Sequence, residues 1–544
     1  MIRNPFLPAL VAAAALAAGC SPEQARPPCP EGKLCLHAGN TSEPNTLDPH
    51  KASGTWENNI ISDMLIGLTT DDAAGNPIPG MAERWETSAD GLTWTFHLRE
   101  AVWSDGVPVT AEDFVYAVRR IMNPETAAEY ASLLYVIAGT QAVAEGKAAP
   151  ETIGVRALGP RTLEIKLKNP APYLPELATH YTMYPVPSHI VKQHGDAWVQ
   201  PGRYLSNGPY VLTENRLGDY VKLVKNPRFY DAANVCLDEV YYYPTRDPIA
   251  AERRIKRGEL QYNSDIQSNR IAFLRKPDQI PDYVHTHTYL GVAYLAFNQN
   301  VPAFKDRRVR RALAMAIDRE FITDKLLRAG QEPAYAYVPP GVAGYPAGVE
   351  VDWADWPLER RQAEARRLLA EAGYGPDRPL TVEIKHRNSP DPMLWMPAVQ
   401  ADWQAVGVKA ELMQNETQIA YAAYRSRDFQ VADAAWIADY NDAMSFLYLH
   451  ESSTGAQNYG DYKNPAYDAL IAQANNEADA GRRAEIMRRA ETVMLADAPI
   501  APIYFYVAKT LVSPELTGFV PNIVDKHRKR FMCFKGARQQ AQAG

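Results

Sequence analysis

Residues 79–117 read PGMAERWETSADGLTWTFHLREAVWSDGVPVTAEDFVYA, and this stretch decides the expected fold. Its middle part, GLTWTFHLRE (91–100), alternates apolar and polar side chains, which is typical of a β-strand with one buried face. The turn-rich segment WSDGVPVT follows and ends at Thr110. Thr110 and Asp113 have the spacing of a capping box, which predicts that a helix begins there. A strand followed by a capped helix indicates a chain that mixes α and β structure.

The same two patterns recur along the rest of the chain. TLEIKLK (162–168) alternates cleanly and predicts another strand. Residues 306–330 carry one apolar helical stripe, and Gly330 is expected to end that helix. Two further helices are expected at 359–374 and 482–497, each followed by a strand-like run. Because 544 residues are too many for one hydrophobic core, we expect two or three domains in an α/β or mixed α+β fold with several sheets.

Composition and motifs argue against several classes of function. The net charge of −7 and the pI of about 5.9 do not favour a nucleic-acid partner. The sequence has no G-x-S-x-G, H-E-x-x-H, P-loop or dinucleotide-binding motif, so neither an enzyme nor a cofactor is predicted. His285 and His287 are spaced to share one face of a strand and could bind a metal. With no third ligand evident, a solvated strand face is favoured and no metal is expected.

The N-terminus, MIRNPFLPALVAAAALAAGC (1–20), has the pattern of a secretory signal. Arg3 precedes an apolar stretch that is too short to span a bilayer, so residues 1–19 are predicted to be a signal peptide. The small residues before Cys20 resemble the lipobox of bacterial lipoproteins, although Ala17 stands where leucine is usual. This implies a diacylglycerol on Cys20; the alternative is an ordinary signal peptide cleaved nearby. By the same resemblance, Ser21 indicates the inner leaflet of the outer membrane if the cell is Gram-negative.

Residues 20–35 are expected to form a polar, proline-rich tether between the lipid and the fold. After lipidation of Cys20, four cysteines remain, and in an oxidising compartment an even number favours disulfides. Three pairings are possible. The weakly favoured one joins Cys29 to Cys35, which enclose a short turn, and Cys236 to Cys533, which lie in strand-like runs.

Seven stretches of the chain carry a family resemblance. In order they are TLDPHKASG (46–54), residues 79–117, NPETAAEYASLL (123–134), NPRFYDAANVCLDEVYYYP (226–244), AFKDRRVRRALAMAIDRE (303–320), LLAEAGY (368–374) and WIADYNDAMSFL (436–447). Together they resemble the oligopeptide-binding branch (family 5) of the extracytoplasmic solute-binding proteins that feed ABC importers. The likeness runs from about residue 36 to the C-terminus. It implies a monomeric binding receptor in the periplasm or cell envelope, whose partners are short peptides and an inner-membrane permease with its ATPase.

The resemblance also implies a type II periplasmic-binding-protein fold, in which two lobes close over the ligand by a hinge motion. The chain would cross between the lobes near residues 290 and 506. The expected domains are domain I (36–65, 190–290 and 507–544), domain II inserted into the same lobe (66–189), and domain III as the second lobe (291–506). All four cysteines that remain after lipidation would fall in the first lobe or in the tether that leads into it.

The resemblance assigns the central role to Asp439 in WIADYN. In peptide-binding relatives, the aspartate of this motif pairs with the α-ammonium of the bound peptide. A buried carboxylate flanked by aromatic residues is costly alone and becomes favourable when a cation completes it. The alternative is that Asp439 caps a local turn or bonds to a core tyrosine. The other site residues that the resemblance implies are Trp436 and Tyr130, which would line the cleft, and Ser53, Gly54, Thr55, Ala435, Trp436 and Ile437, whose main chain would bond to the peptide.

The chain departs from the family pattern at the far end of the cleft. Where relatives hold the ligand carboxylate with basic residues, the matching positions are Leu327, Pro392, Tyr424 and Asp433. A small shift of register would bring in Arg328, Arg425, Arg427 or His386 instead. Asp433 could instead receive a lysine, arginine or diaminopimelate side chain. Gly291 and Ile437 stand where some relatives have a cysteine pair.

Other ligands and roles are compatible with the same resemblance. Relatives take murein peptides, metal chelates, haem or other small solutes, and a scaffold of this kind can also serve as a sensory or surface lipoprotein without transport. Asp439 discriminates among these ligands, because an amine-bearing ligand needs it and a sugar or a metal chelate does not. An enzyme would need a nucleophile and a base, and no such pair is identified.

Overall fold

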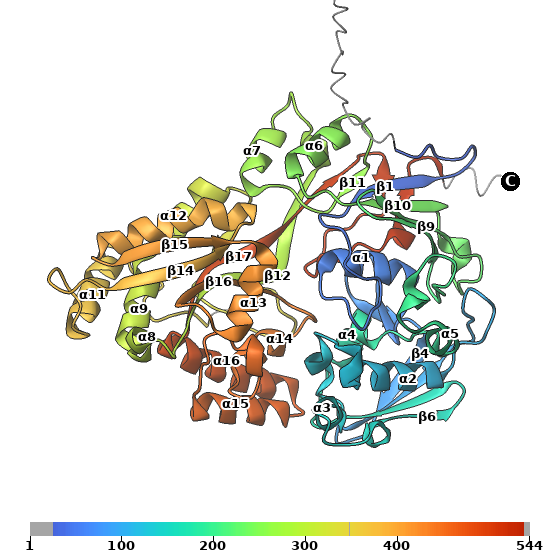
Figure 1. The fold of residues 1–544 in the computed structure, drawn as a ribbon, viewed down its shortest axis with the longest axis horizontal. Helices are drawn as coiled ribbons and strands as arrows, with labels where there is room; N and C mark the ends of the chain where they lie inside the picture. Colours follow the sequence, from blue (N-terminus) through green and yellow to red (C-terminus); the bar gives the residue numbers. More distant parts are fainter. Residues whose placement is uncertain (1–25, 347–348, 538–544) are drawn as a thin grey trace, which may run out of the picture.

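The computed structural model describes residues 26–346 and 349–537, so the predicted signal peptide and Cys20 lie outside the described residues. The chain forms two bodies, each with its own sheets and helices (Figure 1). One body contains α1 and the elements up to β11, and the other contains the helices and strands between α8 and α16. In the described part of the chain, no helix is long and apolar enough to cross a membrane.

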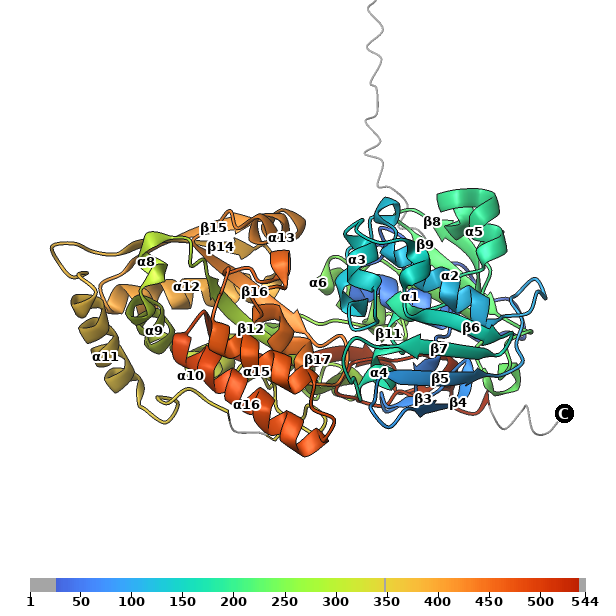
Figure 2. The same ribbon diagram turned by 90° about the horizontal axis from the view of Figure 1, so that it is seen from below.

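A mixed sheet of eleven strands runs through both bodies. Its two longest strands, β12 and β17, pair antiparallel at the centre and extend from one body into the other (Figure 2). The order across the sheet, with β13 (Glu332–Pro333) pairing β17 off the path, is β15 (Lys409–Asn415), β14 (Thr381–Arg387), β16 (Val431–Ile437), β12 (Val284–Phe297), β17 (Ile500–Val512), β11 (Tyr262–Asn263), β1 (Cys35–Gly39), β10 (Glu239–Tyr243), β9 (Tyr220–Lys225) and β8 (Tyr210–Arg216).

The connection between the bodies has a break in its ladder. Residues 284–288 of β12 pair with 507–511 of β17, and residues 292–296 pair with 500–505. Between Thr288 and Val292 the register shifts, as in a β-bulge. The lobe crossings expected near 290 and 506 lie inside these two strands, beside the shift.

The strand and the capped helix expected from residues 79–117 are both present. The alternating segment forms β5 (Thr93–Leu98), and the backbone N–H of Thr110 donates to Asp113 Oδ2 at 2.9 Å, which starts α2 (Ala111–Met122). The strand expected at 162–168 is β7 (Thr162–Lys166). Both strands belong to a separate antiparallel sheet in the order β4 (Ala82–Thr87), β5, β7 and β6 (Val155–Gly159). A two-stranded sheet, β2 (Thr69–Asp71) with β3 (Pro77–Pro79), lies next to it in the chain.

The prediction of a single helix at 306–330 is wrong. The structure has α9 (Arg307–Ala316), a break at Ile317, α10 (Arg319–Phe321) and a π-helical turn (Ile322–Leu327). The side chain of Asp318 accepts from the backbone N–H of Phe321 and so caps a new helix. The buried Arg319 guanidinium donates to the carbonyls of Ala314 and Ile317, at the end of α9, and to those of Ala334 and Pro502. These bonds hold the bend in place.

The other two expected helices are α11 (Leu358–Glu371) and α16 (Ala480–Asp497), followed in the chain by β14 and β17 respectively. The first body also contains α1 (Thr55–Met64), α3 (Thr140–Ala144), α4 (Leu174–Leu177), α5 (Ser188–His194), α6 (Pro248–Lys256) and α7 (Ile271–Leu274). The second also contains α8 (Pro302–Lys305), α12 (Pro390–Ala405), α13 (Thr417–Ser426), α14 (Met444–Leu447) and α15 (Pro465–Asn475).

Disulfides join Cys29 to Cys35 and Cys236 to Cys533, the pairing that the sequence weakly favoured. Cys35 begins β1, and Cys533 begins β19 (Cys533–Phe534), which pairs with β18 (Leu516–Thr517) near the C-terminus. The second bridge therefore ties the C-terminal segment to the residues that lead into β10.

Candidate functional site

Asp439 lies two residues beyond the end of β16, and its carboxylate lacks a full set of partners. Its backbone N–H donates to Ser445 Oγ at 3.0 Å. Its Oδ2 atom is shielded from solvent and has no hydrogen-bond partner among the described residues. Burial raises the pKa of the Asp439 carboxyl to about 7, and the nearby Lys526 ammonium only partly offsets this. A cation placed beside an enclosed carboxylate in this condition would stabilise its ionised form.

Tyrosine side chains from both bodies surround Asp439. Burial is the main cause that raises the pKa of each of these hydroxyls, and the charge of Asp439 adds to it, so they stay neutral at physiological pH. Within the first body, the rings of Tyr130 and Tyr181 lie 6.4 Å apart. The carboxylate is therefore enclosed between the two bodies by Tyr130, Tyr181, Tyr289 and Tyr448.

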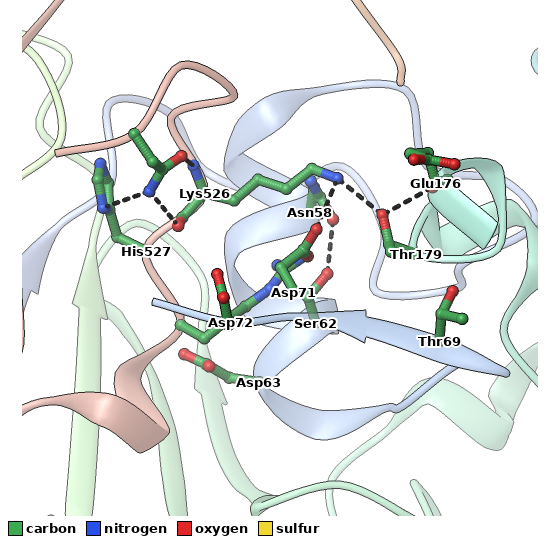
Figure 3. Close-up of polar contacts among 12 residues, drawn as sticks. Asn58, Ser62, Asp63, Thr69, Asp71, Asp72, Glu176, Thr179, Lys526 and His527 are labelled. Carbon is green, nitrogen blue, oxygen red and sulfur yellow. Dashed lines mark hydrogen bonds and ion pairs between the residues drawn. The ribbon is translucent and has the colours of Figure 1, made fainter. Parts of the chain in front are cut away.

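Lys526 is the cation whose field reaches Asp439, but its hydrogen bonds go elsewhere. Its ammonium donates to Asp71 Oδ1 at 3.2 Å and to Thr179 Oγ1 at 3.0 Å (Figure 3). Asp71 also accepts from the Arg528 guanidinium, so one buried carboxylate serves two cations. Lys526 thus makes the surroundings of Asp439 more positive without satisfying its carboxylate.

The main chain of β16 has an open edge next to Asp439. Residues 431–437 pair with β12 along one side of the strand. On the other side, β14 pairs only with Val431 and Ala432, so the outer edge at Ala435, Trp436 and Ile437 has no partner strand within residues 26–346 and 349–537. The Trp436 ring is buried and packs edge-on against Tyr448, with ring centroids 6.2 Å apart. Trp436 therefore contributes its side chain to the core and its backbone to the exposed edge.

The segment Ser53–Gly54–Thr55 leads into α1. Gly54 is the N-cap of that helix; its N–H donates to Glu57 Oε2 at 2.8 Å, and its carbonyl accepts from Asn58 N–H at 3.1 Å. The amide of Gly54 is thus already bonded within the protein. The prediction that this segment binds a ligand through its main chain applies more directly to Ser53 and Thr55.

Asp433 is not a free acceptor in this structure. It is fully buried, and Arg387 at the end of β14 binds it through two contacts, Nε to Oδ2 at 2.8 Å and Nη2 to Oδ1 at 2.9 Å. The same guanidinium donates to the Tyr421 hydroxyl at 3.0 Å. The prediction that Asp433 receives a cationic side chain of the ligand would therefore require Arg387 to move.

Sequence reasoning missed Arg387, although it considered the adjacent His386. Of the other positions named for the far end of the cleft, Leu327 and Tyr424 are fully buried, and Arg328 and Arg425 are exposed. Lys509 is a second buried cation in this region: its ammonium donates to Asp391 Oδ2 at 3.1 Å and to Ser268 Oγ at 2.9 Å. Both cations interact electrostatically with the Tyr506 hydroxyl on β17: Arg387 acts to lower the pKa of Tyr506, and Tyr506 acts to raise the pKa of Lys509.

Residues 76–458 match the family model of bacterial extracellular solute-binding proteins, family 5. The periplasmic oligopeptide-binding protein OppA of Escherichia coli K12 is 37% identical over 491 residues, which are 90% of each chain. The crystal structure of Haemophilus influenzae OppA in complex with the peptide RPPGFSPFR is 32% identical, with a TM-score of 0.84, and the alignment covers 93% of this chain and 99% of that one.

The Escherichia coli murein tripeptide binding protein MppA provides a comparison of conformations. Its structure aligns with 92% of this chain and 99% of its own, at 35% identity and a TM-score of 0.85. For the unliganded open form of MppA the TM-score falls to 0.74 at the same identity, over 93% of this chain and 98% of that one. The arrangement of the two bodies here is therefore closer to the peptide complex of OppA than to the open form of MppA. By sequence and by fold, this chain belongs to the bacterial extracellular solute-binding proteins of family 5.

Proposed function

We propose that this protein is a receptor that encloses short peptides between two lobes and delivers them to an ABC import permease and its ATPase. The observation that carries the proposal is the buried Asp439 Oδ2 atom, which has no partner among the described residues. A peptide α-ammonium supplies both the hydrogen-bond donors and the positive charge that this carboxylate lacks. The receptor thereby selects ligands that have a free amino terminus.

The open edge of β16 provides the next contacts along the ligand. An extended peptide placed there adds a strand beside Ala435, Trp436 and Ile437, and its main chain is bound without reference to its sequence. The Tyr130 hydroxyl lies within the field of the Asp439 carboxylate, at the amino-terminal end of this proposed site. Because every peptide has the same main chain, a receptor built in this way accepts many sequences.

We place the hinge where the two long strands, β12 and β17, cross between the lobes. We assign the moving parts as predicted from the sequence: residues 36–65, 66–189, 190–290 and 507–544 form one lobe, and residues 291–506 form the other. The register shift between Thr288 and Val292 gives β12 a local irregularity where the lobes would rotate. The TM-scores support a closed arrangement in this structure.

We further propose that the mature chain begins at Cys20, carries lipid there and remains tethered in the cell envelope, at the inner leaflet of the outer membrane if the cell is Gram-negative. Residues 20–35 then form the tether that leads into the first lobe. The protein works as a monomer and catalyses no reaction. Murein peptides fall within this proposal, since they also present an amine, whereas ligands without an amine fall outside it.

Native mass spectrometry of the protein as purified tests the proposal directly. We expect the wild-type receptor to retain a mixture of short peptides, because the binding is not sequence-specific. Asp439→Asn, purified in parallel, should be mostly empty. A retained ligand that contains no amine, or equal loading of the two proteins with peptide, would contradict the assignment of Asp439.

A further inference from the structure

Three side chains that could bind a metal ion meet where β12 lies beside the C-terminal segment. His287 lies on β12, and Asp525 and His527 lie in the C-terminal segment. Nε2 of His527 is 2.8 Å and Nε2 of His287 is 3.3 Å from the same oxygen, Asp525 Oδ1. One ligand atom from each residue lies within 4.8 Å of the others. The sequence suggested His287 as a metal ligand but showed no third ligand near it; the fold brings Asp525 and His527 beside it.

The spacing of these atoms suits a tetrahedral metal ion. Zinc binds histidine nitrogen and carboxylate oxygen at about 2.0–2.2 Å, which places neighbouring ligand atoms about 3.3 Å apart. The His287–Asp525 distance of 3.3 Å matches that value, and the His527–Asp525 distance of 2.8 Å is shorter because these two side chains are hydrogen-bonded. Two imidazoles and one carboxylate form a ligand set that zinc commonly takes, with water in the fourth position.

An unsatisfied side chain points independently to a ligand at this place. The side chain of His287 is only 10% exposed, and neither of its ring nitrogens makes a hydrogen bond to a described residue. Its Nε2 lies 3.3 Å from Asp525 Oδ1, a contact of ion-pair length, and its Nδ1 has no partner among the described residues. A buried imidazole with so few partners costs folding free energy, because it has lost its bonds to water. A metal ion would provide the missing partner.

We propose that His287, Asp525 and His527 form a binding site for a divalent transition metal, Zn²⁺ in the first place. The imidazoles of His287 and His527 and the carboxylate of Asp525 are the protein ligands. Phe519 stacks against His527, with ring centroids 4.4 Å apart, and forms an apolar wall beside the site. The ring of His285 is also close to Phe519, with ring centroids 5.0 Å apart, and His285 is not one of the proposed ligands.

The position of the site connects it to peptide binding, a step that rests on the proposed function. Asp525 and His527 flank Lys526 in the chain, and the Lys526 side chain extends away from His527 toward Asp71 and Thr179 (Figure 3). His287 lies on β12, one of the two strands that join the bodies. A metal ion would therefore fix the backbone of Lys526, and with it the positive charge near Asp439, to the strand that crosses between the lobes.

Titration of the metal-stripped protein with Zn²⁺ alone, by calorimetry, tests the site. We expect one ion per chain, and at least a tenfold loss of affinity in His287→Gln and in Asp525→Asn. Asp525 has a left-handed φ of 51°, which asparagine also tolerates, so Asp525→Asn preserves the backbone and decides the matter if His287→Gln misfolds. His285→Gln is the matched control, two residues away on the same strand, and should bind as the wild type does.

Two results would overturn the site: wild-type affinity no higher than that of Asp525→Asn, or an equal loss in His285→Gln. Because this titration contains no peptide, its failure leaves the receptor function intact, and a failure of peptide binding leaves the site intact. For the coupling, we expect Zn²⁺ to change peptide affinity at least threefold in the wild type and not in Asp525→Asn. Equal peptide affinity with Zn²⁺ and with a chelator would refute the coupling.

Discussion

The ammonium of Lys526 lowers the pKa of the Asp439 carboxyl through its field, yet its hydrogen bonds go to Asp71 and Thr179. Burial has the larger effect, so the pKa of Asp439 still rises to about 7. The positive charge of Lys526 thus lies near Asp439 without forming a hydrogen bond that would neutralise its carboxylate. A carboxylate with this balance binds an incoming cation more favourably than one that is already paired.

Asp439→Asn should lower the affinity for peptides and raise the stability of the empty protein. We expect peptide affinity to fall ten- to a thousandfold, because the charge-assisted bond to the ammonium is lost. A rise in the pKa from 3.8 to about 7 means that the ionised carboxyl destabilises the empty fold at pH 8, by about 2–4 kcal/mol. The empty variant should therefore melt at a higher temperature than the empty wild type, as measured by calorimetry.

Asp433→Asn is the matched comparison, since Asp433 lies on β16 six residues before Asp439. Its carboxylate is bonded to Arg387, so the substitution leaves a buried guanidinium without its partner. We expect a loss of about 3–5 kcal/mol in the free energy of unfolding. If the two substitutions destabilise the protein equally, Asp439 is a structural residue and the ligand assignment is wrong.

Peptide affinity should depend on pH through Asp439. In the empty receptor the carboxyl holds its proton below about pH 7, and an ammonium must displace that proton to bind. Affinity should therefore fall by about tenfold per unit below pH 7. By the same sign, the empty fold loses stability as the pH rises from about 4 through 7, since the raised pKa favours the protonated folded state.

Calorimetry from pH 5.5 to 8.5 in two buffers with different ionisation enthalpies would detect the displaced proton. Asp439→Asn should give a flat profile, and a wild-type profile equally flat would contradict the assignment. The hydroxyls and the imidazole beside Asp439 keep their charge state over this range, since the hydroxyls have raised pKa values and burial lowers the pKa of His180 to about 3. Burial also lowers the pKa of Lys526, and Asp439→Asn retains this lysine and so controls for it. The hydroxyls belong to Tyr130, Tyr181, Tyr289 and Tyr448.

Asp391 should favour the closed arrangement of the bodies. It lies in the first turn of α12 and accepts from Lys509, on β17, and from Ser268, in the first body. Asp391→Asn removes the charge that pairs with Lys509, so we expect a three- to thirtyfold loss of peptide affinity. Small-angle scattering should show a larger radius of gyration without ligand. Glu364→Gln, a change on α11 that breaks the pair between a partly buried glutamate and the exposed Arg367, should alter neither measurement.

Cys20→Ser tests the lipid anchor. The variant lacks the thiol that would receive the diacylglycerol, so the protein should move from the membrane fraction to the soluble fraction. Fractionation with immunodetection is sufficient to see this, and metabolic labelling with a fatty acid should mark only the wild type. Continued membrane association of the variant would reject lipidation at Cys20.

Local signals in the sequence were enough for most of the secondary structure. The β5–α2 unit follows from alternation and from the capping box of Thr110 and Asp113, which act within a few residues. The helix at 306–330 was mispredicted because Arg319 bonds to Pro502, far along the chain, and this tertiary contact outweighs the helical pattern. Arg387 escaped notice for a related reason, since its partner Asp433 is 46 residues away.

In the candidate sites, too, single residues could be identified from the sequence, whereas their partners are known only from the fold. The family resemblance identified Asp439 in its motif, but only the fold shows that Oδ2 lacks a partner and that Lys526 lies nearby. Likewise, His287 could be seen in the sequence as a candidate ligand, while Asp525 and His527 join it only through the path of the C-terminal segment. Which charges remain unpaired is a property of the packed structure and has no local pattern.

The most direct test compares one short peptide with its N-acetylated form, by calorimetry on the stripped wild-type receptor at pH 8. Acetylation removes the amine charge and leaves the rest of the main chain and all side chains unchanged. We expect the free peptide to bind at least tenfold more tightly, and Asp439→Asn to abolish most of this difference. Equal affinity for the two peptides in the wild type would mean that Asp439 does not hold the amino terminus.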